Sequence, residues 1–247
     1  MLPEKRQVDN LKMAFDMPFE EEFAIGNLTE ESMVCGYYFP QSLKNYFEKA
    51  VLFQSKDAAT KWQKKWLWFI KKVGWLNSHD YLLLKSPYNI ARIEEILEIF
   101  PNAQFIHLHR NPIEVYASSK YLLEKSLPEL ALQKWDDQIV EKFVIDSYVS
   151  LMEKFINTKK LILDNHLIEI SYASLISDPM SVIDGIYKQF NLDLSDDAVM
   201  KIKRELDGYK NYKSNSFTVT NEERQQVKLK WMPLYRKMLT DVKSTQS

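Results

Sequence analysis

The sequence predicts an α/β domain of three layers, in which helices flank a parallel sheet. Short apolar runs of strand length alternate along the chain with longer stretches whose apolar residues recur at helical spacing. Such alternation favours a parallel sheet because each helix returns the chain to the end of the sheet where the previous strand began. The 247 residues suit one core, so we expect a single domain over residues 1–247.

Residues 57–76 are predicted to form the first long helix, with lysines on much of its outer face. Its apolar stripe consists of Trp62, Trp66, Phe69, Ile70 and Val73. We assign this stripe to the core rather than to a cofactor site, because apolar residues at helical spacing usually pack against other elements. The apolar run 81–84 then indicates a buried parallel strand that ends at Lys85, and a helix follows it until Pro101.

Two further strands are predicted at 104–108 and 167–170. The first leads into a helix that begins near Pro112, and the second leads into a loop at 172–175 with a helix beginning near Pro179.

Two long helices complete the expected elements. One covers residues 136–157, and the other opens at Thr220, which forms a capping-box pattern with Glu223. The inward residues of the last helix are expected to be Val227, Trp231, Leu234 and Met238.

Composition excludes several classes of site. The formal net charge is −1, so no general field draws the chain to nucleic acid or anionic lipid, and a small anion needs a local cluster of cations. The single cysteine, Cys35, permits no intrachain disulfide and favours a reducing compartment, so we expect a cytoplasmic protein. The histidines lack metal-ligand spacing, no apolar run reaches the length of a membrane span, and the N-terminus does not resemble a signal peptide.

Arg110 and Ser118 are the first candidate binding residues. Arg110 follows the strand 104–108, at the edge where ligands of open α/β sheets bind, and its guanidinium suits bidentate contact with a phosphate. Free N–H groups of the following helix would face the same edge, and Ser118 lies about two turns along that helix. The alternative is that Arg110 caps a neighbouring helix and Ser118 only packs.

The segments around these residues resemble a known family. FPNAQFIHLHRNPIEVYASS at 100–119 resembles the 3′-phosphate-binding segment of sulfotransferases that use 3′-phosphoadenosine-5′-phosphosulfate (PAPS). LLLKSPYNIARIEEILEIFP, just before it, resembles the family's Leu-Lys-Ser-Pro segment. Weaker likeness covers EEEFAIGNLTEESM at 20–33, ISYASLISDP at 170–179 and the basic DGYKNYKSNSFTV at 207–219.

The resemblance implies roles for particular residues. Arg110 and Ser118 would hold the 3′-phosphate, and Lys85 would act on the transferring sulfuryl group, where negative charge must be stabilised. The candidates for a lid over the nucleotide are Lys210, Lys213 and Asn215. The alternatives are a solvated lysine at position 85 and a solvated basic loop.

The chain departs from the family pattern in two ways. None of its five glycines lies in the Ser-Gly-Thr-Thr loop that wraps the 5′-phosphosulfate, so we expect a truncated form of the family's P-loop-NTPase-like sheet, with unpaired backbone and apolar surface. Asn89 stands where many relatives have a histidine that serves as general base. His107 and His109 are expected to pack on one side of their strand, which leaves the base unassigned.

The expected function is that of a nucleotide-binding transferase, a sulfotransferase that moves a sulfuryl group from PAPS to a hydroxyl or amine acceptor without a metal. The alternative is a catalytically impaired relative that binds 3′-phosphoadenosine-5′-phosphate or acts as partner of an intact homologue. A nucleoside kinase is disfavoured because the chain has no Gly-x-x-x-x-Gly-Lys motif. The acceptor would be a small molecule, a glycan or a lipid. We expect no nucleic-acid partner and no membrane span, and homo-oligomer formation stays open.

Overall fold

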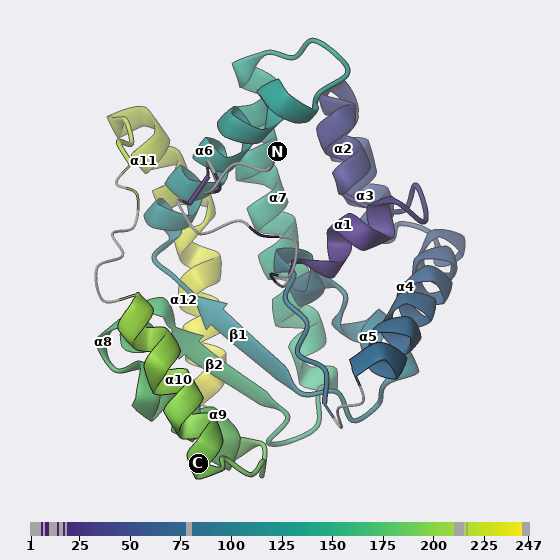
Figure 1. Ribbon diagram of the computed structural model, residues 1–247. Helices are drawn as coiled ribbons and strands as arrows, with labels where there is room; N and C mark the ends of the chain where they lie inside the picture. The colour runs from purple at the N-terminus through teal and green to yellow at the C-terminus, as the bar shows by residue number, and fades with distance from the viewer. Residues whose placement is uncertain are drawn as a thin grey trace.

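Among the residues that the structure describes, the sheet has two parallel strands, β1 (Phe105–His109) and β2 (Leu167–Ser171) (Figure 1). The computed structural model describes residues 6, 8–9, 14, 17, 19–77, 81–209, 215 and 217–243. The strands pair in register from Phe105 opposite Leu167 to His109 opposite Ser171. The strands predicted at 104–108 and 167–170 are therefore confirmed to within one residue.

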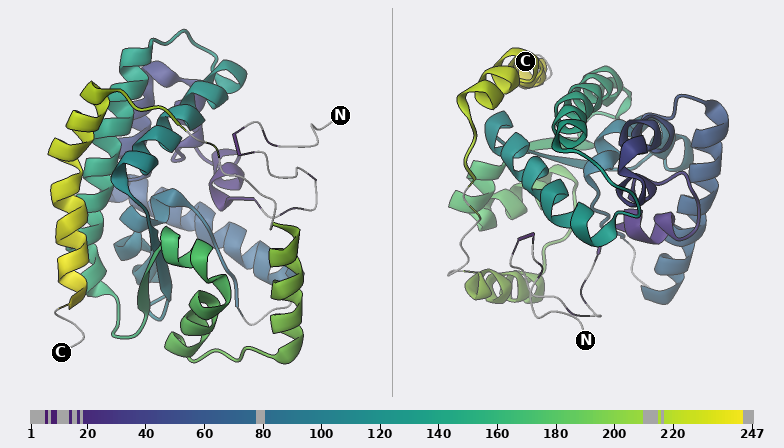
Figure 2. Two further views of the ribbon diagram at one scale, coloured as in Figure 1. Left: turned by 90° about the vertical axis from the view of Figure 1, so that its left-hand side faces the viewer. Right: turned by 90° about the horizontal axis from the view of Figure 1, so that it is seen from above.

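Helices lie on both sides of the strands, which confirms the predicted α/β fold. α7 (Asp137–Thr158) and α12 (Met232–Lys243) cover one side, while α8 (Tyr172–Ser177), α9 (Pro179–Gln189) and α10 (Asp196–Gly208) lie beside β2 on the other (Figures 1 and 2). His107 and His109 face the first group, as predicted. The His107 ring lies 4.4 Å from that of Phe155, and Nδ1 of His109 is 3.0 Å from the hydroxyl of Tyr235.

The N-terminal part of the chain forms a helical layer around a tryptophan core. Its elements are α1 (Glu21–Gly26), α2 (Val34–Tyr38), α3 (Leu43–Ala50), α4 (Lys56–Asn77) and α5 (Ile93–Ile99), with 3₁₀ turns at Pro40–Ser42 and Pro87–Ala91. Trp62 and Trp66 of α4 are buried and stacked, with ring centroids 5.1 Å apart. They pack in one cluster with Ile25, Phe53 and Ile96, which confirms the assignment of this stripe to the core.

The helix after β1, α6 (Pro112–Leu130), is tied to the C-terminal helix α11 (Asn221–Lys230). The predicted capping box is present, because Thr220 and Glu223 each accept a hydrogen bond from the other's backbone. The Glu223 carboxylate also accepts from Lys120 of α6, with 2.5 Å between the two atoms. The start of α11 therefore fixes the helix that carries Ser118.

The predicted last helix is divided in two at Trp231. α11 ends at Lys230 and α12 begins at Met232. These helices pack near α7, which ends in a short 3₁₀ turn (Lys159–Leu161). Pro233 has no N–H to donate to the carbonyl four residues earlier, so the helical hydrogen-bond ladder stops there. The inward direction of the predicted residues is confirmed. Val227, Trp231 and Met238 are buried, and the partly exposed Leu234 packs against the core.

The predicted strand at 81–84 is wrong. The segment is extended but joins no ladder, and Tyr81 and Leu83 are 71% and 85% exposed. Within the described ranges β1 pairs with β2 alone, and its apolar residues Ile106 and Leu108 are 41% and 45% exposed. A strand needs a neighbour on which to form hydrogen bonds, and the segment 81–84 has none there. The expected unpaired edge and exposed apolar surface are confirmed for these residues.

The predicted loop at 172–175 is also wrong, because this segment is the helix α8. The side chain of Ser171, the last residue of β2, accepts a hydrogen bond from the Ser174 N–H at 3.0 Å and so caps the helix.

In the described ranges, no helix is both long enough and apolar enough to cross a lipid bilayer.

Candidate functional site

The carboxyl ends of the two strands bring Arg110 and Tyr172 together. His109 pairs in register with Ser171, so the residues that follow each strand emerge side by side. The Arg110 guanidinium lies over the Tyr172 ring, with 4.5 Å between its carbon and the ring centroid. Two segments that are 62 residues apart in the chain thus meet at the edge where ligands of open α/β sheets bind.

The helix α6 begins at this edge, but its first N–H groups are already bonded. The side chain of Asn111 accepts from the Ile113 N–H at 2.9 Å, and its carbonyl accepts from the N–H groups of Glu114 and Val115 at 3.0 Å. The expectation that free helix N–H groups face a ligand here is therefore wrong. An anion at this edge has to be held mainly by side chains.

Arg110 and Ser118 both form hydrogen bonds with residues of α6. Nε of Arg110 donates to Glu114 at 2.5 Å, and the Ser118 hydroxyl donates to the carbonyl of Val115 at 3.0 Å. This hydrogen bond of Arg110 is thus made to a side chain and not to a carbonyl at a helix end. The Arg110–Glu114 pair is partly exposed, so a phosphate could replace Glu114 as partner at small cost. The guanidinium at this edge has the chemistry that a phosphate requires, while Ser118 lies further along α6.

Lys85 follows the extended segment and projects into solvent, with its ammonium in an ion pair with the carboxylate of Glu20. Its side chain is 76% exposed, while that of Glu20 is 25% exposed. A cation and a proton acceptor thus stand in contact at the segment that resembles the family's Lys-Ser-Pro motif. The sequence assigned no role to Glu20 itself, although this residue begins the segment 20–33, which weakly resembles the family.

Glu20 belongs to an acidic triplet, Glu20, Glu21 and Glu22, each member of which bonds one residue of the segment 85–92. Glu21 accepts from the Asn89 amide at 2.6 Å, and Glu22 pairs with Arg92 at 2.6 Å. The Glu22–Arg92 pair is almost completely buried. Asn89, which replaces a histidine of many relatives, is therefore the partner of a buried carboxylate rather than a base.

The proposed lid is only partly within the described residues. Lys210 and Lys213 lie outside them, and Asn215 donates from its amide to the carbonyl of Val8 at 2.9 Å. Their contact with a nucleotide stays a prediction. In the described part of the chain, no group of three or more His, Cys, Asp or Glu side chains is arranged to hold a metal ion.

The charge of Glu22 is stabilised strongly enough to outweigh its burial. Burial alone would raise the pKa of this carboxyl group, but the Arg92 charge and hydrogen bonds from Arg92, Met33 and Ser32 lower it below its ordinary value of 4.5. The ionised pair therefore contributes to the stability of the folded chain at neutral pH.

We expect the free energy of unfolding to decrease as the pH falls below about 4.5, the ordinary value for Glu22. The pKa of Glu22 is lower in the folded chain than in the unfolded chain. The stability that the Glu22–Arg92 pair contributes is therefore complete above the unfolded pKa and is lost as the pH falls through the folded pKa. Urea unfolding at a series of pH values should show a shallower acid slope for Glu22→Gln than for wild type. The exposed Glu205→Gln is the control. Equal slopes for all three proteins would contradict this assignment.

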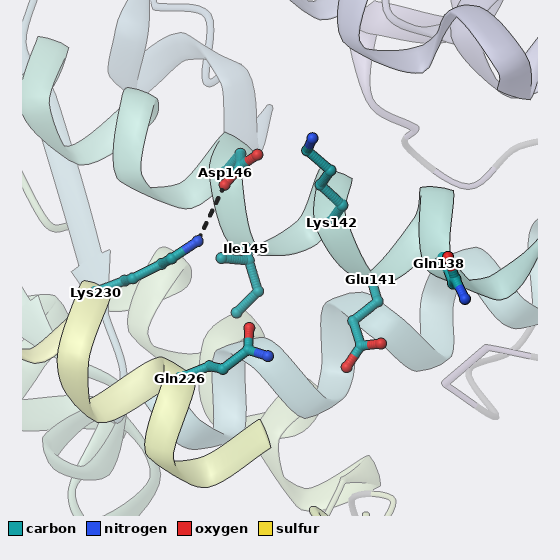
Figure 3. A pocket seen from close by; sticks show the side chains of 7 residues that line it. All are labelled: Gln138, Glu141, Lys142, Ile145, Asp146, Gln226 and Lys230. Carbon is teal, nitrogen blue, oxygen red and sulfur yellow. Dashed lines mark hydrogen bonds and ion pairs between the residues drawn. The ribbon is translucent and has the colours of Figure 1, made fainter. Parts of the chain in front are cut away.

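A separate groove lies between α7 and α11, with a volume of about 270 Å³ (Figure 3). Its lining side chains are Gln138, Glu141, Lys142, Ile145, Asp146, Gln226 and Lys230. Lys230 and Asp146 face each other across it at 3.5 Å. No residue of β1, β2 or the segment 85–92 lines this groove, so it is distinct from the candidate site.

Comparison with solved structures identifies the fold. The chain superposes on the crystal structure of sulfotransferase STF9 from Mycobacterium avium with a TM-score of 0.68 and 17% identity, over 92% of this chain and 56% of that one. For sulfotransferase STF1 from Mycobacterium tuberculosis the TM-score is 0.57 at 18% identity, over 79% of this chain and 53% of that one. At these identities the likeness concerns the fold alone.

Sequence relatives point the same way. The chain is 27% identical over 232 residues to proteins of Mycobacterium bovis and Mycobacterium tuberculosis named omega-hydroxy-beta-dihydromenaquinone-9 sulfotransferase Stf3. The match covers 94% of this chain but 60% of each relative, so the chain spans about three fifths of their length. The model of the sulfotransferase family matches residues 18–196, and the chain therefore belongs to the sulfotransferase family.

Proposed function

We propose that this protein transfers a sulfuryl group from PAPS to a hydroxyl acceptor. The observation that carries this proposal is the contact between Lys85 and Glu20, which places a cation beside a proton acceptor. Membership of the family supports the reaction, and the Arg110 guanidinium at the end of β1 supports a phosphorylated donor.

Glu20 and Lys85 have complementary parts in the proposed reaction. The acceptor oxygen forms a bond to sulfur while the bond between sulfur and the bridging oxygen of the donor phosphate breaks. Glu20 accepts the hydroxyl proton as the oxygen attacks. The Lys85 ammonium stabilises the negative charge that grows on the departing phosphate, which leaves as the 3′,5′-bisphosphate nucleotide. Glu20 thereby takes the role for which position 89 has no base.

Arg110 and Ser118 would hold the 3′-phosphate of the donor, with Lys210, Lys213 and Asn215 as the lid. When the donor binds, its 3′-phosphate would replace Glu114 as the partner of Arg110. The Tyr172 ring would keep the Arg110 guanidinium in place. The reaction needs no metal, because cationic side chains supply the positive charge. We place it in the cytoplasm, the reducing compartment that the single Cys35 favours.

The acceptor class is inferred from the chemistry of a carboxylate base and from the name of the Stf3 relatives. A carboxylate base of this kind suits a hydroxyl better than an amine, since an unprotonated amine attacks without a base. The relatives named Stf3 carry the name of a hydroxylated menaquinone, which is a lipid-soluble quinone. We therefore propose a hydroxylated lipid as the first acceptor to test.

Arg110→Ala is expected to weaken binding of the 3′,5′-bisphosphate nucleotide about 10- to 100-fold, since a charged hydrogen bond contributes roughly 1.5–3 kcal/mol. Calorimetric titration of wild type and variant measures this change. Arg204→Ala, which removes an exposed arginine from α10, is the matched control. Wild type that fails to bind the nucleotide below about 1 mM would overturn the donor assignment. Nucleotide binding without transfer of labelled sulfate would overturn the enzymatic role alone.

A further inference from the structure

The outer face of α4 combines positive charge with exposed aromatic rings. Eight outward residues recur three or four positions apart and so share one side of the helix. They are Lys61, Lys64, Lys65, Trp68, Lys71, Lys72, Trp75 and Leu76, and we call them the lysine–tryptophan face. α4 lies at the edge of the molecule in Figure 1 and in the right-hand view of Figure 2, and all eight residues are exposed, so this face points away from the body of the protein.

The charge of α4 contrasts with that of the whole chain. The helix has six lysines and one acidic residue, Asp57, which gives it a net charge of +5 while the chain as a whole carries −1. Asp57 pairs with Lys61 near the start of the helix, so the positive charge dominates in the later turns. A partner drawn to this face must therefore be anionic, and the attraction must be local.

Apolar surface lies among these lysines. Trp75 is 82% exposed and Leu76 is 62% exposed, and the Lys72 ammonium lies 5.4 Å from the centre of the Trp68 ring. The exposed Tyr81 and Leu83 lie beside this face rather than on it, since Leu82 of their segment is within contact of a side chain placed at Gly74, on another side of α4. A partner at this face must therefore also accept apolar rings.

We propose that the lysine–tryptophan face binds the surface of an anionic lipid bilayer. Tryptophan rings prefer the boundary between headgroups and acyl chains, and lysine side chains there extend their ammonium groups to the lipid phosphates. Helices that bind in the plane of the interface combine lysines, which attract anionic lipids, with tryptophan and leucine side chains, which enter the headgroup boundary. Nucleic acid would neutralise the lysines but would leave Leu76 and Leu83 in water.

The proposal is tested by flotation of the whole protein with phosphatidylcholine vesicles, with and without phosphatidylglycerol. Wild type should float with the anionic vesicles and be released as NaCl is raised. Because each lysine near an anionic surface contributes about fivefold, the double variant K71Q/K72Q should bind at least tenfold more weakly. Trp75→Ser should weaken binding several-fold without changing its salt dependence.

Matched controls separate this surface from general charge and apolarity. K201Q/K203Q removes the same charge from α10, and Leu229→Ser removes an exposed apolar side chain from α11, so both should bind like wild type. Equal loss in the controls, or equal binding to neutral vesicles, would overturn the proposal. Binding to a polynucleotide that K71Q/K72Q loses, with no binding to vesicles, would overturn it in favour of a nucleic-acid surface. The readout needs no sulfate transfer, so it stands apart from the proposed reaction.

Discussion

Arg92→Met is expected to lower the free energy of unfolding by about 3–5 kcal/mol. The Arg92 guanidinium is fully buried and bonds Glu22 at 2.6 Å and the carbonyl of Ala50 at 2.7 Å. It also lies 4.7 Å from the centre of the Trp62 ring. Methionine fills much of the volume but leaves the Glu22 carboxylate buried without a counterion. Since small domains have 5–15 kcal/mol of stability in total, the loss is a large share of it.

Urea unfolding followed by circular dichroism measures this loss. Lys61→Met is the matched control, because it removes the cation of an exposed pair on α4 and should leave stability close to that of wild type. The double variant Glu22→Gln with Arg92→Met should recover part of the loss, since no buried charge then remains. An Arg92→Met protein as stable as the control would show that the pair contributes little.

Glu20→Gln is expected to lower kcat about 10²- to 10⁴-fold, the range in which a general base contributes. Glutamine has nearly the same shape as glutamate, and its amide oxygen can still accept a hydrogen bond from Lys85. It cannot take the proton of the acceptor hydroxyl. Binding of the bisphosphate nucleotide should stay within about threefold of wild type, because its phosphates are assigned to other residues. The measurement is transfer of labelled sulfate from PAPS to a hydroxylated quinone lipid, with kcat and KM determined separately.

The control for this variant is Glu30→Gln, which changes an exposed glutamate that pairs with Lys49. It should leave kcat unchanged. Glu21→Gln distinguishes the two neighbouring carboxylates, since Glu21 is buried and bonded to Asn89. Full activity in Glu20→Gln combined with loss in Glu21→Gln would move the role of base to Glu21.

Local patterns predicted the elements whose hydrogen bonds are local. The capping box at Thr220, the tryptophan stripe of α4 and the strand at 104–108 were all correct within a residue or two. The segment 81–84 has the composition of a buried strand, but a strand also requires a paired neighbour, which no window of sequence contains. The helix at Tyr172 was missed because its start depends on one cap from Ser171.

The residues of the candidate site also divide into those that local sequence patterns predicted and those that depend on distant contacts. Arg110, Ser118 and Lys85 could be named because they lie within two short segments with a recognisable spacing. The acidic triplet could not, because its three bonds join residues that are distant in the chain, and a run of glutamates otherwise suggests a solvated surface. Asn89 looked like the loss of a base, and only its contact with Glu21 shows what the side chain does.

The span of those three bonds has a consequence for the order of folding. They join residues separated by 65, 68 and 70 positions, so each requires closure of a long loop after α4 has docked. Local helices form in microseconds, whereas contacts of this range come late. We therefore expect Lys85 and Glu20 to meet late in folding, so that a chain with most of its helices formed would still lack the assembled candidate site.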